Sequence, residues 1–111
     1  MKIEQRRHGA VLVLRPEGPL AGEDVLAFTS SLRAGMEASL GRLVIDASAI
    51  PYVDSAGLLA LVEAGEEVGS GGRSLKLCGA CDTMRETFEL TEVSDLFEFY
   101  DDASMAVRSF L

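Results

Sequence analysis

The sequence is poor in the residues that most often carry enzyme chemistry. It has no tryptophan, two cysteines and a single histidine, His8. A histidine-based catalytic triad needs a histidine that contacts a nucleophile and is itself oriented by an acid. His8 stands beside Gly9, between two short segments of strand character, where we expect a solvent-exposed hairpin turn. Histidine-dependent catalysis is therefore not expected.

A phosphate-binding loop and a long apolar run are also missing. No Gly-Lys-Ser or Gly-Lys-Thr occurs, and the glycine-rich residues 69–72 precede an expected strand, which is the wrong order for a phosphate loop. No run reaches the roughly 18 apolar residues of a membrane span, and residues 1–7 lack the apolar core of a signal peptide. We therefore expect a cytoplasmic chain with no membrane span and no bound cofactor.

Positive charge is scarce. The chain has 10 Lys and Arg against 18 Asp and Glu, which gives a net charge of −8 at pH 7. Nucleic-acid binding depends on a basic patch that neutralises phosphates, so nucleic acid is a poor partner. The acidic excess either keeps the protein in solution or steers it toward a basic partner, and composition does not separate the two.

The two cysteines have the spacing of a redox or metal-binding pair, Cys78-Gly79-Ala80-Cys81. They lie where an expected strand passes into a helix, and a helix N-terminus favours a thiolate. One such pair supplies only two of the four ligands of a structural zinc site, and no histidine is near to complete it. We favour two small, partly buried cysteines in a reducing compartment and keep a thiol redox role as an alternative.

The length of 111 residues and 48% hydrophobic content match one domain, residues 1–111, with a single core. Residues 2–7 and 10–15 predict a β-hairpin. Pro16-Glu17-Gly18-Pro19 contains helix and strand breakers, so we expect the chain to leave the sheet there.

Helices and strands alternate in the rest of the chain. The apolar spacing of Val25, Phe28, Leu32 and Met36 predicts a helix from about residue 22 to 41. Further elements are predicted at residues 43–46 (strand), 55–68 (helix, ended by the glycine-rich turn), 74–78 (strand), from Asp82 as N-cap (helix), 97–100 (strand) and from residue 101 (helix). The fold class is therefore α/β, with a mixed, mostly parallel sheet, an antiparallel N-terminal edge strand and about four flanking helices.

Two carboxylates, Asp46 and Asp54, follow successive expected strands. Carboxyl ends of parallel strands share one edge of a sheet, where α/β proteins bind ligands, so this pair is able to hold a magnesium ion. The interpretation that we favour is a local one, a helix cap and a turn acceptor, because little indicates a substrate pocket.

The chain is organised around Val53-Asp54-Ser55-Ala56-Gly57-Leu58, where an extended segment turns into a helix. This junction places Ser55 at the N-cap or in the first turn, beside free backbone amides. Either Ser55 or Asp54 caps the helix, or Ser55 is a phosphorylation switch. Small Ala56 leaves the hydroxyl accessible, and Gly57 allows another backbone to approach closely.

These residues resemble the STAS-domain family, and within it the bacterial anti-sigma factor antagonists. The resemblance rests on Asp54-Ser55-Ala56-Gly57-Leu58, with support from Gly18-Pro19-Leu20, Leu43-Val44-Ile45-Asp46 and Leu90-Thr91. The chain departs from many relatives at Leu59, where they have glycine, and at Glu92-Val93, where they have Gly-Leu.

The resemblance implies a switch rather than an enzyme. It implies that an anti-sigma factor with serine kinase activity phosphorylates Ser55, that the unphosphorylated form binds this kinase and frees a sigma factor, and that a phosphatase restores the active form. The implied docking surface comprises Asp24, Asp54, Ser55, Ala56, Gly57 and Leu58. STAS domains also serve as stressosome-like scaffolds and lipid-transporter subunits, so a non-switching role remains the alternative.

Overall fold

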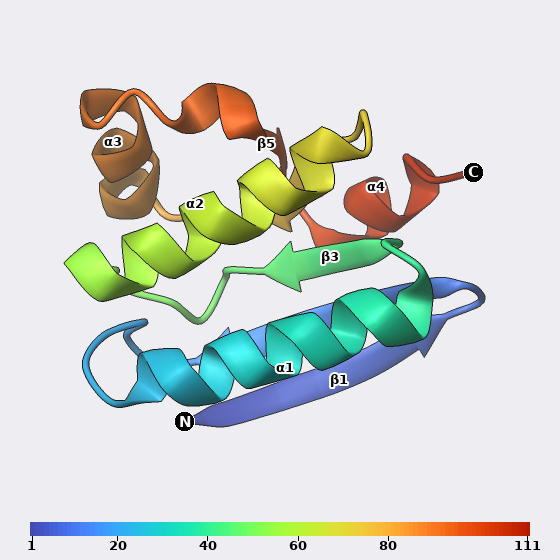
Figure 1. Cartoon of the computed structure of the whole chain (residues 1–111), viewed down its shortest axis with the longest axis horizontal. Coiled ribbons are helices and arrows are strands. Elements are labelled where there is room, and N and C mark those ends of the chain that lie inside the picture. The colour runs from blue at the N-terminus through green and yellow to red at the C-terminus, as the bar shows by residue number, and fades with distance from the viewer.

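The structure, a computed structural model, describes residues 1–111 and contains a five-stranded sheet with helices on both faces (Figure 1). The strands are β1 (Lys2–His8), β2 (Val11–Glu17), β3 (Leu43–Asp46), β4 (Leu75–Cys78) and β5 (Phe97–Tyr100). The helices are α1 (Asp24–Ser39), α2 (Ser55–Ser70), α3 (Asp82–Leu90), the 3₁₀ turn η1 (Ser94–Leu96) and α4 (Ala103–Arg108). No helix combines the length and the apolar character needed to cross a bilayer.

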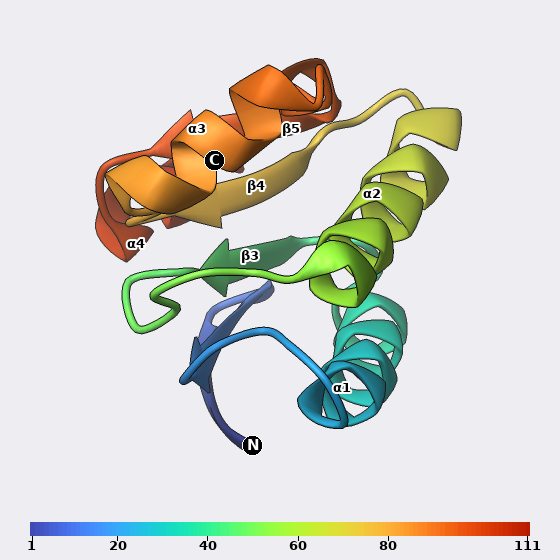
Figure 2. The same cartoon turned by 90° about the vertical axis from the view of Figure 1, so that its left-hand side faces the viewer.

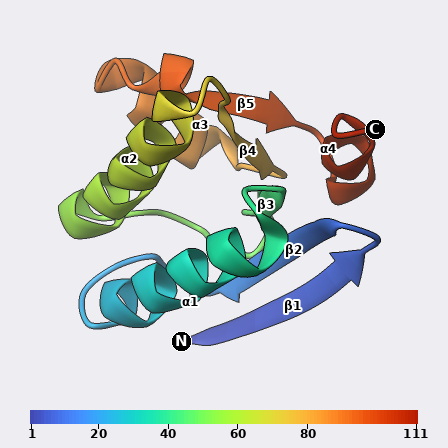
Figure 3. The same ribbon diagram turned by 45° about the vertical axis from the view of Figure 1, so that its right-hand side comes forward.

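The strand order in the sheet follows the order of the chain, β1-β2-β3-β4-β5. β1 pairs antiparallel with β2, and every later pair is parallel. Helical crossovers join the parallel strands, as Figure 3 shows for α1 between β2 and β3. The expected α/β class, the mixed and mostly parallel sheet and the antiparallel edge strand are confirmed.

Two apolar clusters hold the layers together. The larger lies between the sheet and helices α1, α2 and α3, and includes Phe28, Leu61 and Phe88. The smaller lies on the opposite face, where Ala106 of α4 packs on Val13 and Val44. Figure 2 shows α1 and α2 together on one side of the strands and α4 on the other. Residues of β3 alternate between the two clusters, so this strand is buried on both faces, as its β-branched run predicts.

The expectation that the chain leaves the sheet at Pro16 is wrong. β2 continues to Glu17, and Pro16 pairs in register with Ile3. At the position of Pro16, a backbone N–H would point toward β3. The pairing of β3 with β2 ends at Leu14, so no β3 residue lies there to accept a hydrogen bond. The proline therefore removes no ladder hydrogen bond, and the chain turns away only after Glu17.

Two helix ends also differ from the predictions. Cys81, in extended conformation, is the N-cap residue of α3, and Asp82 is the first helical residue. An acid in the first turn is favourable beside the helix dipole even when it does not cap. α2 continues to Ser70, so the first half of the glycine-rich segment is helical and only Gly71 and Gly72 form the turn.

Candidate functional site

The candidate site is the N-terminus of α2, where Asp54 is the capping residue. Asp54 has extended backbone angles, and its Oδ1 accepts a hydrogen bond from the N–H of Gly57 at 2.8 Å. Ser55 is the first helical residue and takes no part in the cap. Of the two capping arrangements that the sequence allows, the structure has the one with Asp54, which satisfies one of the free amides of the first turn.

The same carboxylate ties this helix to a distant loop. Oδ2 of Asp54 accepts a hydrogen bond from the N–H of Gly22 at 2.9 Å. The backbone adds two further bonds between the segments, from Asp54 N–H to Leu20 O at 3.1 Å and from Leu20 N–H to Tyr52 O at 3.1 Å. The loop that precedes α1 and the loop that precedes α2 are therefore joined into one rigid unit.

Gly57 makes this unit possible. It is buried, and a Cβ built on it would overlap the carbonyl oxygen of Leu20 and lie 3.1 Å from the Leu20 Cγ. Only glycine therefore allows α2 to sit this close to the loop. The expected close approach of a second backbone at Gly57 is present, and that backbone belongs to the same chain.

The hydrogen bonds also affect the charge of the site. Donation from Gly57 N–H, and next from Gly22 N–H, holds the pKa of Asp54 below its ordinary value of 3.8. Asp54 is therefore a carboxylate at neutral pH. A fixed negative charge lies directly before Ser55 in the chain.

Ser55 itself is exposed, and its hydroxyl makes no hydrogen bond to the protein. Ala56 is also exposed, whereas Leu58 is half-buried and packs against the larger core cluster. The first turn of α2 therefore presents Ser55 and Ala56 to solvent and turns Gly57 and Leu58 inward. The hydroxyl is sterically open to a reaction partner.

Asp24 begins α1, two residues after the Gly22 that binds Asp54. Its carboxylate lies 3.1 Å from the N-terminal amine of Met1, and its side chain is 47% exposed. The Asp54 bond to Gly22 thus fixes the start of α1 relative to α2. Figure 1 shows the first turns of both helices at the same end of the molecule.

Three exposed apolar side chains near this end were not predicted as site residues. They are Tyr52 (49% exposed), Leu59 (56%) and Leu26 (76%). Leu59 follows Ser55 by four residues, so the two side chains lie on the same side of α2. The sequence therefore already indicates, through the four-residue helical spacing, that Leu59 lies beside Ser55. The exposure of Tyr52 and Leu26 depends on how the loops and helices pack.

The other candidate groups are engaged in local contacts. Asp46 accepts a hydrogen bond from the N–H of Ser48 at 3.0 Å, and its carboxylate lies 3.9 Å from the Arg15 guanidinium. Asp54 caps α2. Each of the two carboxylates therefore accepts a hydrogen bond from a nearby backbone N–H. Both cysteines are free thiols. Burial, and next the charge of Asp46, raises the pKa of Cys78 to about 12, while the Cys81 thiol lies 3.4 Å from the carbonyl oxygen of Pro51.

Comparison with known proteins places the fold in a family. The family model for the STAS domain matches residues 2–106. The solved structures that this chain resembles include the Thermotoga maritima protein TM1081, a proposed anti-sigma factor antagonist. The TM-score is 0.86 at 18% sequence identity, and the alignment covers 96% of this chain and 92% of that chain.

Two further structures have the same fold. One is an anti-sigma factor antagonist from Mycobacterium paratuberculosis (TM-score 0.82, 22% identity, 97% and 92% covered). The other is the phosphorylated form of the Bacillus cell fate determinant SpoIIAA (TM-score 0.72, 14% identity, 99% and 100% covered). Comparison with curated protein sequences finds no match. At these identities, the structural similarity establishes a shared fold.

Proposed function

The chain belongs to the STAS domain family, and from this we propose that it acts as an anti-sigma factor antagonist controlled by phosphorylation of Ser55. The unphosphorylated form binds an anti-sigma factor that is also a serine kinase, and this binding releases a sigma factor. Phosphorylation of Ser55 ends the binding, and a phosphatase restores it. SpoIIAA, which has the same fold, has been solved in a phosphorylated form.

The observation that carries the proposal is the separation of two roles between adjacent residues. Asp54 provides the helix cap and the bond to Gly22, and Ser55 provides an exposed hydroxyl with no internal partner. A phosphate on Ser55 therefore breaks no hydrogen bond of the fold. Such a position allows a protein to be modified without being unfolded.

The magnitudes favour an effect on binding rather than on stability. A phosphate adds about −1.5 to −2 charges, and the N-terminus of a helix stabilises an anion by only about 0.3 to 1 kcal/mol. The charge of Asp54 opposes that small gain. A doubly charged phosphate about 6 Å from a partner carboxylate costs roughly 5 kcal/mol at an effective dielectric of about 20, on the order of a thousandfold in affinity.

The proposed docking surface divides into contact residues and supporting residues. Ser55 and Ala56 are exposed and contact the kinase directly, together with the first turn of α1 at Asp24. Asp54 and Gly57 hold the surface in shape through Gly22 and Leu20. Leu58 anchors the turn in the core.

The non-switching alternative, a scaffold or lipid-transporter subunit, assigns Ser55 the role of helix cap. That assignment has no support in the geometry, because the cap is Asp54. The alternative therefore leaves the exposed hydroxyl of Ser55 without a function.

The proposal is tested by incubating the protein with ATP and a candidate anti-sigma kinase from the same genome, and then mapping phosphate by mass spectrometry. We expect one phosphate, on Ser55, and none on a Ser55→Ala variant. Ser70→Ala is the matched control, since Ser70 ends the same helix and is also exposed. Phosphate at another residue, or none with a kinase that binds the chain, would contradict the proposal.

A further inference from the structure

β1 is an edge strand with its outer side uncovered. It pairs with β2 alone, over seven residues from Lys2 to His8, and it has no neighbour on the other side. Five of its seven residues are exposed. Figure 3 shows this strand as the free border of the sheet, with α1 above it. An edge of this length is able to accept another strand.

The register shows which backbone groups face outward. Leu12 of β2 donates its N–H to Arg42 O at 2.9 Å, so this residue turns its backbone groups toward β3. Successive residues of a strand face opposite sides, so Val11 and Val13 turn theirs toward His8 and Arg6. The alternate residues of β1, Ile3, Gln5 and Arg7, therefore have N–H and C=O groups that point away from the sheet.

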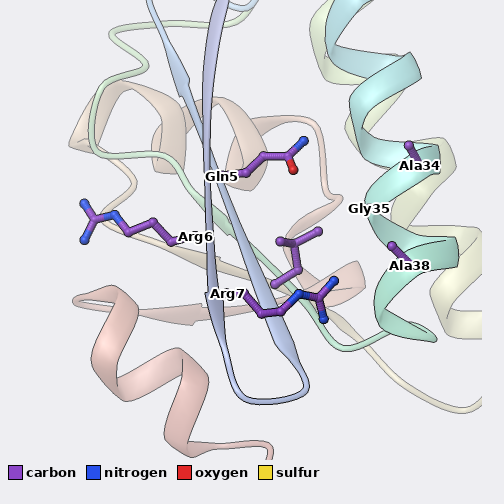
Figure 4. A pocket seen from close by; sticks show the side chains of 7 residues that line it. Gln5, Arg6, Arg7, Ala34, Gly35 and Ala38 are labelled. Atoms are coloured by element: carbon purple, nitrogen blue, oxygen red, sulfur yellow. The ribbon is translucent and has the colours of Figure 1, made fainter.

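The side chains of two of these residues, Gln5 and Arg7, border a groove. A cavity of about 300 Å³ lies between β1 and α1, lined by Gln5, Arg6, Arg7, Leu12, Ala34, Gly35 and Ala38. Figure 4 shows Gln5 and Arg7 extending from β1 toward α1, while the Arg6 side chain extends away from them. The helix wall consists of small residues, which leave space beside Arg7.

The groove is cationic in an acidic protein. β1 carries three basic residues and one acid, whereas the whole chain has a net charge of −8. The residues that line the groove include two arginines and no Asp or Glu. Arg6 pairs with Glu4 at 3.1 Å and Lys2 with Glu17 at 3.6 Å, while Arg7 has no ion pair. The uncompensated charge is therefore that of Arg7.

We propose that β1 and this groove form a docking site for an extended acidic segment of a partner protein, which adds to the sheet beside β1. Its backbone pairs with the outward groups of Ile3, Gln5 and Arg7, and an alternate acidic side chain pairs with Arg7. A second copy is a poorer occupant, because Ile3 and Gln5, the other β1 residues on the face of Arg7, supply no acid to pair with it. The site is separate from Ser55, since α1 lies between β1 and α2 (Figure 1).

The test uses a capped synthetic peptide of about eight residues with alternating valine and glutamate, a typical strand length. The matched control peptide has lysine in place of glutamate. We expect the glutamate peptide to shift the backbone amide signals of Gln5 and Arg7 in NMR spectra of the full chain, and to slow their hydrogen exchange about tenfold or more. The lysine peptide should leave them unchanged.

Two pairs of variants separate backbone pairing from charge. Gln5→Pro removes an outward N–H and should abolish peptide binding, whereas Gln5→Ala keeps the N–H and should bind within about threefold of the wild type. Arg7→Glu should weaken binding about tenfold or more, and Arg108→Gln, an exposed arginine on α4, should not. If Gln5→Pro fails to fold, the peptide affinity of Arg7→Glu still tests the proposal.

Several outcomes would overturn the proposal. These are equal binding of both peptides, amide shifts confined to the start of α2, full binding by Arg7→Glu, or no binding at millimolar peptide. A different result would assign the edge to a second copy instead. Sedimentation would then show a dimer, and hydrogen exchange would show the Gln5 and Arg7 amides protected in the absence of peptide.

Discussion

Gly57 of α2 packs directly on the backbone carbonyl of Leu20, with no space for a side chain between them. The contact joins two segments far apart in the chain, and Asp54 reinforces it through Gly22. The position of Ser55 thus depends on a glycine two residues away whose role lies inside the fold.

Substitution of Gly57 by alanine should lower the free energy of unfolding by about 2 to 4 kcal/mol, because the added methyl group displaces backbone rather than a flexible side chain. Gly69→Ala is the matched control on the same helix, where a Cβ meets open space. It should stabilise the protein by up to about 1 kcal/mol. Urea denaturation of both variants checks the pair, and equal effects would contradict the packing described.

Substitution of Asp54 by alanine should cost about 1 to 2 kcal/mol of stability, because it removes the α2 cap and the bond to Gly22. Asp102→Ala removes a cap with a single accepted bond, from Met105 N–H at 2.9 Å, on the short helix α4. It should cost less. Thermal unfolding of the two variants, measured at the same pH, ranks them.

The lowered pKa of Asp54 predicts an acid dependence of stability. A carboxyl whose folded pKa lies below its unfolded value stabilises the fold above the unfolded value, near 3.8, and loses that contribution as the pH falls through the folded pKa. The stability difference between wild type and Asp54→Asn should therefore stay constant near neutral pH and shrink below 3.8. Carboxyl carbon NMR should show Asp54 still ionised at 3.8, and a midpoint at or above that value would contradict the prediction.

Substitution of Ser55 by aspartate should leave the melting temperature within a few degrees of wild type, since Ser55 makes no internal hydrogen bond. Binding to the anti-sigma kinase should weaken about a hundredfold, because one added charge at about 6 Å from a partner carboxylate costs roughly half as much as a phosphate. Ser55→Ala should bind normally. Ser70→Asp, at the other end of α2, should also bind normally, and calorimetric titration compares all three.

The two thiols should differ in reactivity. Cys78 has a pKa raised to about 12 and is almost fully buried, so iodoacetamide near neutral pH should modify Cys81 and spare Cys78 until the protein is unfolded. Mass spectrometry of peptides from folded and unfolded samples distinguishes them. Rapid modification of both in the folded protein would revive the redox interpretation.

Most helices and strands follow from local sequence patterns. The spacing of Val25, Phe28 and Leu32 and the β-branched run of β3 reflect burial on one face or on both, so their periods are readable without a structure. The Asp54-Ser55 junction can also be predicted from the sequence, because an extended segment passes into a helix there.

Other features depend on pairing between distant residues. The effect of Pro16 depends on the side of β2 that its missing N–H faces, which only the register reveals. Asp54 and Ser55 are both good capping residues, and the bond to Gly22, 32 residues away, favours Asp54. The free edge of β1 likewise requires the strand order.

Because the strand order of the sheet is the order of the chain, we expect the fold to assemble in the direction of synthesis. The neighbour of each new strand has already been synthesised, so no strand needs a later part of the chain in order to pair. Leu20 and Gly22 also leave the ribosome before Asp54 and Gly57, so the anchor for α2 precedes the helix that it holds. A nascent chain halted once β4 has left the ribosome should already carry an ordered Ser55.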